Sequence, residues 1–124
     1  MRKVEKQVIG AFLKGERKTV SNTTANNVDG VLSLWLHGHC IARRTRMGLE
    51  INFCGWETPT TQSRLNSLCE LIGLGRPFTI RKGQVRFHGL PIDSDRFYRL
   101  LELNKLWSAH PNNKKAQLNA ACNQ

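Results

Sequence analysis

The chain has 124 residues, and 19 Lys and Arg against 9 Asp and Glu give it a formal net charge of +10. A domain usually spans about 100–150 residues, so this length predicts a single domain. A hydrophobic fraction of 40% excludes a disordered chain, and no apolar run approaches the ~20 residues of a transmembrane helix. The charged start, Met1-Arg2-Lys3, lacks the apolar core of a secretion signal, so we expect a cytoplasmic protein.

The first thirty residues predict one helix and an ambiguous segment. Apolar residues at helical spacing predict a helix over residues 3–14, and Gly15 follows it as a stop signal. Residues 18–27 are rich in Thr, Ser and Asn, which leaves open whether they form an edge strand or a loop. Asp29-Gly30 then predicts a tight hairpin turn.

Three strand-like runs come next, separated by turns that contain glycine. The runs cover residues 31–36, 40–46 and 49–54, and the turns are His37-Gly38 and Met47-Gly48. Leu32, Leu34 and Leu36 share one face of the first run, and in the third run apolar residues alternate with Glu50 and Asn52, which predicts strands with one buried face. In the middle run either face could be the inner one.

A second helix is predicted over residues 59–72. Thr58 can cap this helix, and Pro59 suits its first position because proline lacks an N–H group. We expect three of its apolar side chains to pack on the sheet, namely Leu65, Leu68 and Ile72 against Leu49, Ile51 and Phe53.

The remainder predicts a second hairpin and a last helix. Apolar and polar side chains alternate over residues 78–81 and 84–88, and Lys82-Gly83 predicts a tight turn between these two strands. A helix over residues 94–108, capped by Asp93 or Ser94, has a broad apolar face that includes Phe97, Leu101, Leu106 and Trp107. We expect Trp107 to be buried against the sheet or the first helix.

The order α-β-β-β-α-β-β-α predicts an α+β fold. We expect an antiparallel sheet of about four or five strands with the helices packed on one face. A single domain should cover residues 1–110, and the polar residues 111–124 should form a frayed tail.

Two histidines and two cysteines are candidate metal ligands on neighbouring predicted strands, namely His37, His39, Cys40 and Cys54. Zinc sites usually show Cys-x2–4-Cys or His-x3–5-His spacing, which is missing here, and strand alternation turns Cys40 away from the histidines. We therefore expect no metal and no cofactor. The cysteines also form no Cys-x-x-Cys pair, so we expect reduced thiols, with Cys122 exposed in the tail.

The sequence does not favour an enzyme. The few carboxylates do not form the cluster that a magnesium nuclease needs, and a glycine-rich phosphate loop is missing. A Cys54–His37 nucleophile pair lacks a third group to orient it.

Basic residues concentrate on the two predicted hairpins. They are Arg43, Arg44, Arg46, Arg81, Lys82 and Arg86. Phosphates attract Lys and Arg side chains on rigid strands, so this pattern predicts nucleic-acid binding with low sequence selectivity. Glu50 is the main acid placed to neutralise any of them. If the hairpins share a sheet, their outer faces form one basic stripe.

A longer pattern runs from His37 to about Gly89. It reads His-Gly-x-x-Ile-Ala, starting at His37, and then Gly-Trp-x-Thr-x-Thr-Thr-x-x-Arg-Leu-Asn, starting at Gly55. This pattern resembles that of a family of small bacteriophage and plasmid proteins of unknown function. The resemblance implies a phage or mobile-element origin and a bacterial cytoplasm, and it implies no activity.

The same pattern has two physical interpretations. In the first, Arg64 and Asn66 form hydrogen bonds with neighbouring strand ends or loop carbonyls, and Trp56 packs beneath this corner of the fold. In the second, Arg64 and Asn66 are presented to a ligand as a secondary binding site.

A protein-interaction module that modulates a host factor is the alternative function. The broad apolar face of residues 94–108, with Tyr98 and Trp107, could exceed the needs of one core. The sequence does not determine the oligomeric state.

Overall fold

The computed structural model describes residues 2–109, which form three helices and nine strands. The helices are α1 (Lys3–Lys14), α2 (Pro59–Leu71) and α3 (Leu100–Ala109). The strands are β1 (Lys18–Val20), β2 (Thr23–Val28), β3 (Val31–Leu36), β4 (His39–Thr45), β5 (Gly48–Ile51), β6 (Phe78–Arg81), β7 (Gln84–Phe87), β8 (Leu90–Pro91) and β9 (Tyr98–Arg99).

The strands form two antiparallel sheets, which confirms the predicted α+β fold but not a single sheet. The larger sheet has the order β1-β2-β3-β4-β5-β9, and the smaller has the order β6-β7-β8. Strand β9 pairs with β5 through Glu50↔Arg99 and Ile51↔Tyr98. Because β9 occupies this edge of the larger sheet, the second hairpin cannot join it there and instead starts a separate sheet.

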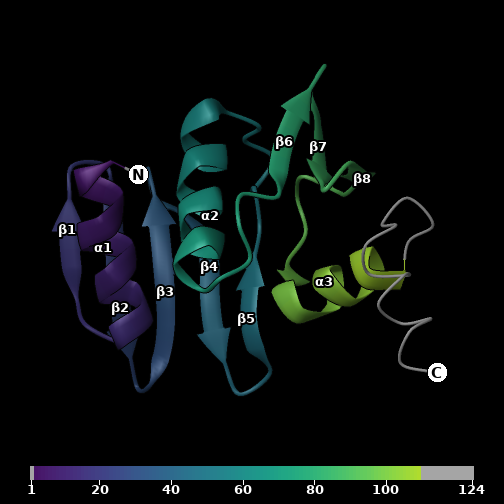
Figure 1. Ribbon diagram of the computed structural model, residues 1–124. Helices are drawn as coiled ribbons and strands as arrows, with labels where there is room; N and C mark the ends of the chain where they lie inside the picture. The colour runs from purple at the N-terminus through teal and green to yellow at the C-terminus, as the bar shows by residue number, and fades with distance from the viewer. Residues whose placement is uncertain (1, 110–124) are drawn as a thin grey trace.

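Helices α1 and α2 cover one face of the larger sheet, as expected, whereas α3 lies at the β5–β9 edge (Figure 1). Helix α1 packs on β1, β2 and β3, helix α2 packs on β4, and helix α3 lies beside β5. The covered face carries Leu32, Leu34 and Leu36 of β3, whereas Val31 and Trp35 on the opposite face are exposed. This alternation follows from the two-residue period of a strand.

Three of the four hairpin turns predicted at a residue followed by glycine occur where expected, whereas the predicted Met47-Gly48 turn lies one residue earlier, at Arg46-Met47, and Gly48 begins β5. Asp29-Gly30, His37-Gly38 and Lys82-Gly83 have positive φ angles at both residues, which is the requirement of a two-residue type I′ turn. The ambiguous segment 18–27 forms the strand β1 and most of β2 rather than a loop.

The two sheets and α2 share one apolar core. Phe53 contacts Phe78 with ring centroids 5.4 Å apart, and Phe78 contacts Phe87 at 5.5 Å, both edge to face. All three rings are buried, together with Leu65 and Leu68 of α2. Ile72, which was expected in this core, is wrongly predicted: it follows the last helical residue and is exposed.

The last helix begins at Leu100, so the predicted start at residue 94 is wrong. Asp93 caps no helix, because residues 94–97 are not helical; its Oδ1 atom accepts a hydrogen bond from the Asp95 N–H in the bend that leads to β9. Tyr98 and its neighbour are drawn into the larger sheet as β9, and the Tyr98 hydroxyl accepts a hydrogen bond from the Asp93 N–H. Because Tyr98 and Arg99 pair with β5, the helix begins at Leu100 and not at residue 94.

Trp107 is half-buried rather than buried as expected, and it packs against the margin of the apolar core. Its ring stacks on His88 at 4.9 Å with an interplanar angle of 16°, against the turn that precedes β8. Residues 111–124, with Cys122, lie outside the described residues. None of the helices within residues 2–109 is long and apolar enough to cross a membrane.

We predict that Phe78→Ala lowers the free energy of unfolding by about 3–5 kcal/mol, because it removes the central ring between the two sheets. Urea denaturation followed by circular dichroism measures this change. The control is Leu106→Ala on an exposed face of α3, which should alter the free energy by about 0.5 kcal/mol or less. Equal effects of the two substitutions would contradict a core that joins the sheets.

Candidate functional site

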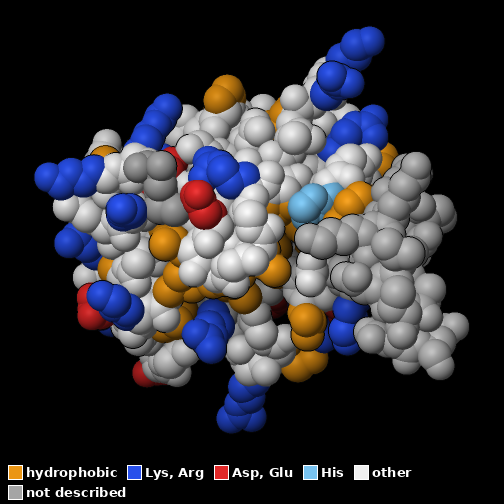
Figure 2. Space-filling view, viewed as in Figure 1, with side chains coloured by type: hydrophobic (Ala, Val, Ile, Leu, Met, Phe, Trp, Pro, Cys, Tyr) orange, Lys and Arg blue, Asp and Glu red, His pale blue; other side chains and the backbone are white. Residues whose placement is uncertain are grey.

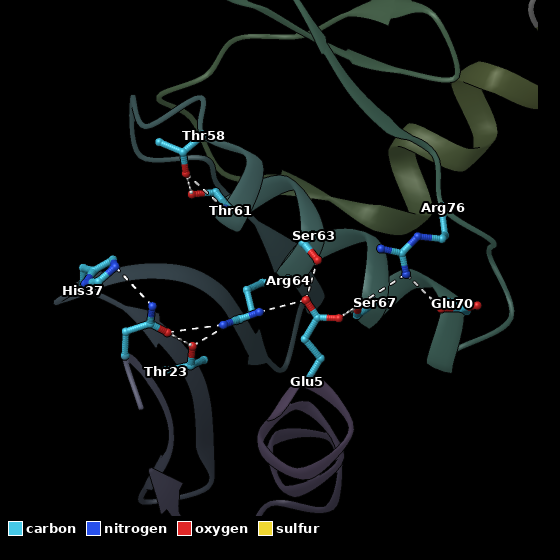
Figure 3. Close-up of polar contacts among 11 residues, drawn as sticks. Glu5, Thr23, His37, Thr58, Thr61, Ser63, Arg64, Ser67, Glu70 and Arg76 are labelled. Atoms are coloured by element: carbon cyan, nitrogen blue, oxygen red, sulfur yellow. Dashed lines mark hydrogen bonds and ion pairs between the residues drawn. The ribbon is translucent and has the colours of Figure 1, made fainter. Parts of the chain in front are cut away.

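A buried ion pair lies where α1, β2 and α2 meet (Figure 3). The Arg64 Nη1 atom donates to Glu5 Oε1 over 2.8 Å, and the two side chains are only 5% and 1% exposed. Glu5 also accepts hydrogen bonds from the hydroxyls of Ser63 and Ser67 on α2. This carboxylate therefore has partners on both oxygens.

The pKa of Glu5 reflects two opposing effects. Burial is the largest single effect and by itself raises the pKa of this carboxyl. The hydrogen bonds from Ser63, Ser67 and Arg64, together with the positive charge of Arg64, outweigh burial and hold the pKa of Glu5 below its ordinary value. The carboxyl is therefore ionised at neutral pH.

The other side of the Arg64 guanidinium reaches the sheet. Arg64 Nε donates to Thr23 Oγ1 over 3.1 Å, and Nη2 donates to Asn22 Oδ1 over 3.3 Å. The amide nitrogen of Asn22 lies 3.3 Å from Nε2 of His37, so the network extends from α1 to the β3–β4 turn. Asn66 exchanges two hydrogen bonds with the backbone of Phe78.

These contacts decide between the two interpretations of the Arg64–Asn66 pattern. Both residues are at most 5% exposed, and their polar atoms are occupied by protein partners. The secondary binding site at Arg64 and Asn66 is therefore a wrong prediction, since neither side chain is available to a ligand. They hold α2 against its neighbours.

The basic residues of the first hairpin do not form one row. Arg43 pairs with Glu50 at 3.2 Å, as the sequence suggested, and its guanidinium lies 3.7 Å above the centre of the Phe97 ring. Arg44 follows it directly in β4 and therefore points to the other face of the sheet. Arg46 is exposed in the β4–β5 turn.

The second hairpin presents its basic residues together. The register Thr79↔Arg86 and Arg81↔Gln84 places these four residues on one face of β6 and β7, with Lys82 at the turn. Within residues 2–109, none of the three basic side chains forms a salt bridge. Arg81 and Arg86 line a groove of about 600 Å³ together with Gln62, Thr79, Ile80 and Gly89, and Lys82 lies at the adjacent turn.

The two basic hairpins are far apart. They belong to different sheets, and the β4–β5 and β6–β7 turns lie at opposite ends of the view in Figure 1. Figure 2 shows Lys and Arg side chains over the projecting β6–β7 end, with no acidic side chain beside them on this face. The single basic stripe expected for a shared sheet therefore does not form.

A pocket that the sequence did not predict opens near the start of α2. It has a volume of about 170 Å³ and is lined by Leu36, His37, His39, Ile41, Phe53, Trp56, Thr58, Thr60 and Thr61. Thr58 caps the helix as predicted, since its Oγ1 atom accepts a hydrogen bond from the Thr61 N–H over 3.2 Å. Half of the twelve residues named in the patterns that start at His37 and Gly55 line this pocket.

Trp56 lies at this pocket and is 52% exposed, so its expected burial beneath the corner is wrong. The chain turns tightly at Cys54 and Gly55, which both have positive φ angles, and this turn leaves the indole at the surface. The indole contacts the His39 ring with centroids 5.1 Å apart.

The cysteine and histidine side chains that are candidate metal ligands do not come together in one cluster. Within residues 2–109, no group of three or more His, Cys, Asp or Glu side chains is close enough to hold a metal ion. Burial raises the pKa of the Cys40 and Cys54 thiols, which donate to the backbone carbonyls of Ala42 and Cys40. Both thiols are therefore protonated at neutral pH and are weak nucleophiles.

Comparison with known proteins identifies a phage family. The model of the Kyanoviridae Gp96 protein family matches residues 1–110 of the chain. No curated protein and no solved structure matches the chain. The family match agrees with the phage origin that the sequence resemblance implied.

We predict that Glu5→Gln lowers the free energy of unfolding by about 3–5 kcal/mol at pH 7, because Arg64 is left as a buried charge without its partner. The folded-state pKa of Glu5 is lowered, so the carboxylate stabilises the fold above the ordinary glutamate pKa of about 4.3. This stabilisation is lost as the pH falls through the lower folded-state pKa. Urea denaturation from pH 7 to pH 3 should show the difference between wild type and variant shrinking.

The matched control is Glu70→Gln. Glu70 pairs with Arg76 at 2.9 Å, but both side chains are more than 40% exposed. Solvent screening limits such a pair to about 1 kcal/mol or less. A difference between wild type and Glu5→Gln that stays constant over this pH range would contradict the role of the Glu5 charge.

Proposed function

We propose that this chain, which belongs to the Kyanoviridae Gp96 family of phage proteins, binds nucleic acid with low sequence selectivity in the cytoplasm of the bacterial host. The proposed interface is the groove lined by Arg81 and Arg86, together with Lys82 at the adjacent β6–β7 turn. The role is binding rather than catalysis, and it requires no cofactor.

The groove that Arg81 and Arg86 line is the observation that carries this proposal. Four other arginines of residues 2–109 are paired with carboxylates, namely Arg43, Arg64, Arg76 and Arg99. The β6–β7 arginines have no such partner, and no acidic residue lines their groove. A concave surface lined by uncompensated positive charge attracts a phosphate backbone.

The construction of the hairpin suits this role. The Lys82-Gly83 turn and the paired strands hold the basic side chains on a short, rigid element. Gln62 of α2 and Thr79 of β6 add uncharged hydrogen-bonding groups to the groove. Contacts to phosphate and sugar carry no direct sequence information, which accounts for the low selectivity proposed here.

The first hairpin has a different part in the proposal. Arg43 is already bound to Glu50 and Phe97, and the exposed Arg44 and Arg46 lie at the end of the molecule away from the groove. These two arginines contribute to the overall positive field that speeds association with a polyanion. In this proposal, Arg44 and Arg46 do not contact the stretch of nucleic acid that lies in the groove.

Binding of a host protein through α3 is the second candidate function. Leu101 and Leu106 of α3 are 66% and 62% exposed, which is unusual for large apolar side chains on one short helix. Affinity capture from host lysate with and without nuclease separates the candidates. Partners that survive nuclease treatment and are lost in Leu101→Asp would favour the protein-binding role.

We predict that reversing charge on the β6–β7 hairpin, in the double variant Arg81→Glu and Lys82→Glu, weakens nucleic-acid binding by tenfold or more at ~50 mM salt. Fluorescence anisotropy with labelled oligonucleotides measures the affinity. The logarithm of the binding constant should also depend less steeply on the logarithm of salt, by roughly 1.4–1.8 for the two lost phosphate contacts.

The matched control is the double variant Arg44→Glu and Arg46→Glu, which changes the net charge by the same amount at the other end of the molecule. It should weaken binding by about twofold to threefold, because it alters only the long-range field. Equal losses in the two variants would contradict a site at the groove. If the wild-type protein retains no nucleic acid at ~50 mM salt, the proposed function is wrong.

A further inference from the structure

We infer that the pocket beside Trp56 receives one unpaired nucleobase of a single-stranded nucleic acid. This inference rests on the proposed nucleic-acid binding and adds the form of the ligand. The pocket supplies an aromatic surface for the base, and the neighbouring groove supplies positive charge for the phosphates.

The size and lining of the pocket suit a single aromatic ring system. Its volume of about 170 Å³ is smaller than the roughly 300–1,000 Å³ of pockets for drug-sized ligands. Trp56, His39 and Phe53 contribute aromatic rings to its lining, and the Trp56 indole is half exposed. Bases stack on such rings in single-strand binding proteins whatever their sequence.

The polar lining matches the edge of a base, which carries both hydrogen-bond donors and acceptors. The Thr60 hydroxyl has no hydrogen-bond partner within residues 2–109. His37 uses Nε2 for its contact with Asn22, which leaves Nδ1 free within the described residues. Because the Asn22 amide donates to Nε2, Nδ1 of His37 can only donate, whereas the Thr60 hydroxyl can donate or accept. The hydroxyl can therefore adapt to the donor or acceptor that different bases present.

The pocket and the basic groove are lined by consecutive residues near the beginning of α2. Thr60 and Thr61 line the pocket, and the next residue, Gln62, lines the groove. The start of α2 and the β6–β7 turn also lie at the same end of the molecule in Figure 1. A strand whose phosphates lie along Arg81 and Arg86 can therefore place a neighbouring base against Trp56.

The buried network holds one wall of the pocket in place. Figure 3 shows His37 joined through a side-chain amide to Arg64, which in turn contacts Glu5. The chain of contacts anchors the β3–β4 turn to α2, the helix that forms the other wall. The pocket therefore exists before a ligand binds, which limits the entropic cost of binding.

Bases in a duplex are not available to such a pocket. A paired base must leave its stack first, at a cost of a few kcal/mol, whereas a base in a single strand is already accessible. We therefore expect tighter binding to single strands than to duplexes of the same length.

The test measures binding of three labelled probes at ~50 mM salt. The probes are a thymidine oligonucleotide of about 12 nucleotides, an abasic sugar–phosphate chain of the same length, and the corresponding duplex. Trp56→Ala should weaken binding of the thymidine probe about 5- to 100-fold and leave the abasic probe unchanged. Trp56→Phe should restore most of the loss, because it keeps a stacking ring.

The matched control is Trp35→Ala, which removes a partly exposed indole from the open face of the larger sheet. It should change the affinity for every probe by less than twofold. Wild-type affinity for the thymidine probe must also exceed that for the abasic chain, a comparison that depends on no variant folding correctly.

Three results separate the two proposals. The pocket proposal is overturned if Trp56→Ala leaves the thymidine affinity unchanged while the Arg81 and Lys82 double variant still loses binding. It is also overturned if wild-type protein binds the abasic and thymidine probes equally. Failure of wild-type protein to bind any probe refutes the nucleic-acid function itself.

Discussion

The buried Glu5–Arg64 ion pair is the constraint on which the arrangement of this protein depends. One carboxylate from α1 and one guanidinium from α2 join two helices, and the guanidinium continues to Thr23 of β2. A buried charge is tolerated only when its partner and hydrogen bonds are in place. Any packing that separates α1 from α2 exposes two charges to an apolar core, so this interaction favours one placement of the helices over the sheet.

That placement brings the start of α2 to the junction between the two sheets. Asn66 fixes the helix to Phe78 at the first residue of β6, while Thr58 and Thr61 border the pocket beside β3 and β4. The groove and the pocket proposed for nucleic acid thus adjoin across one helical turn. A stable hydrophobic core lies beneath them, so their side chains are held by the fold and need little ordering when a ligand binds.

Much of the local structure was predictable because it depends on neighbours in sequence. The turns at Asp29-Gly30 and Lys82-Gly83, the Thr58 cap and the pairing of Arg43 with Glu50 all follow from short-range spacing. The wrong predictions concern contacts between segments that are far apart in the chain, which compete with the local pattern. Tyr98 and Arg99 have a helical pattern, but they pair with β5 because that strand edge has unsatisfied backbone groups. The expected burial of Trp56 follows from the general tendency of large apolar side chains to be buried, and the structure leaves this indole exposed.

The sequence by itself determined the α+β class, the hairpins, the capped helix and the excess of positive charge, since periodicity, turn residues and composition act locally. Only the tertiary structure decided that the hairpins enter separate sheets, that Arg64 and Asn66 are buried, and that the patterns at His37 and Gly55 meet in one pocket. These outcomes depend on which strand edges are occupied and which charges find partners. Both are properties of segments far apart in the chain, and no local pattern encodes them.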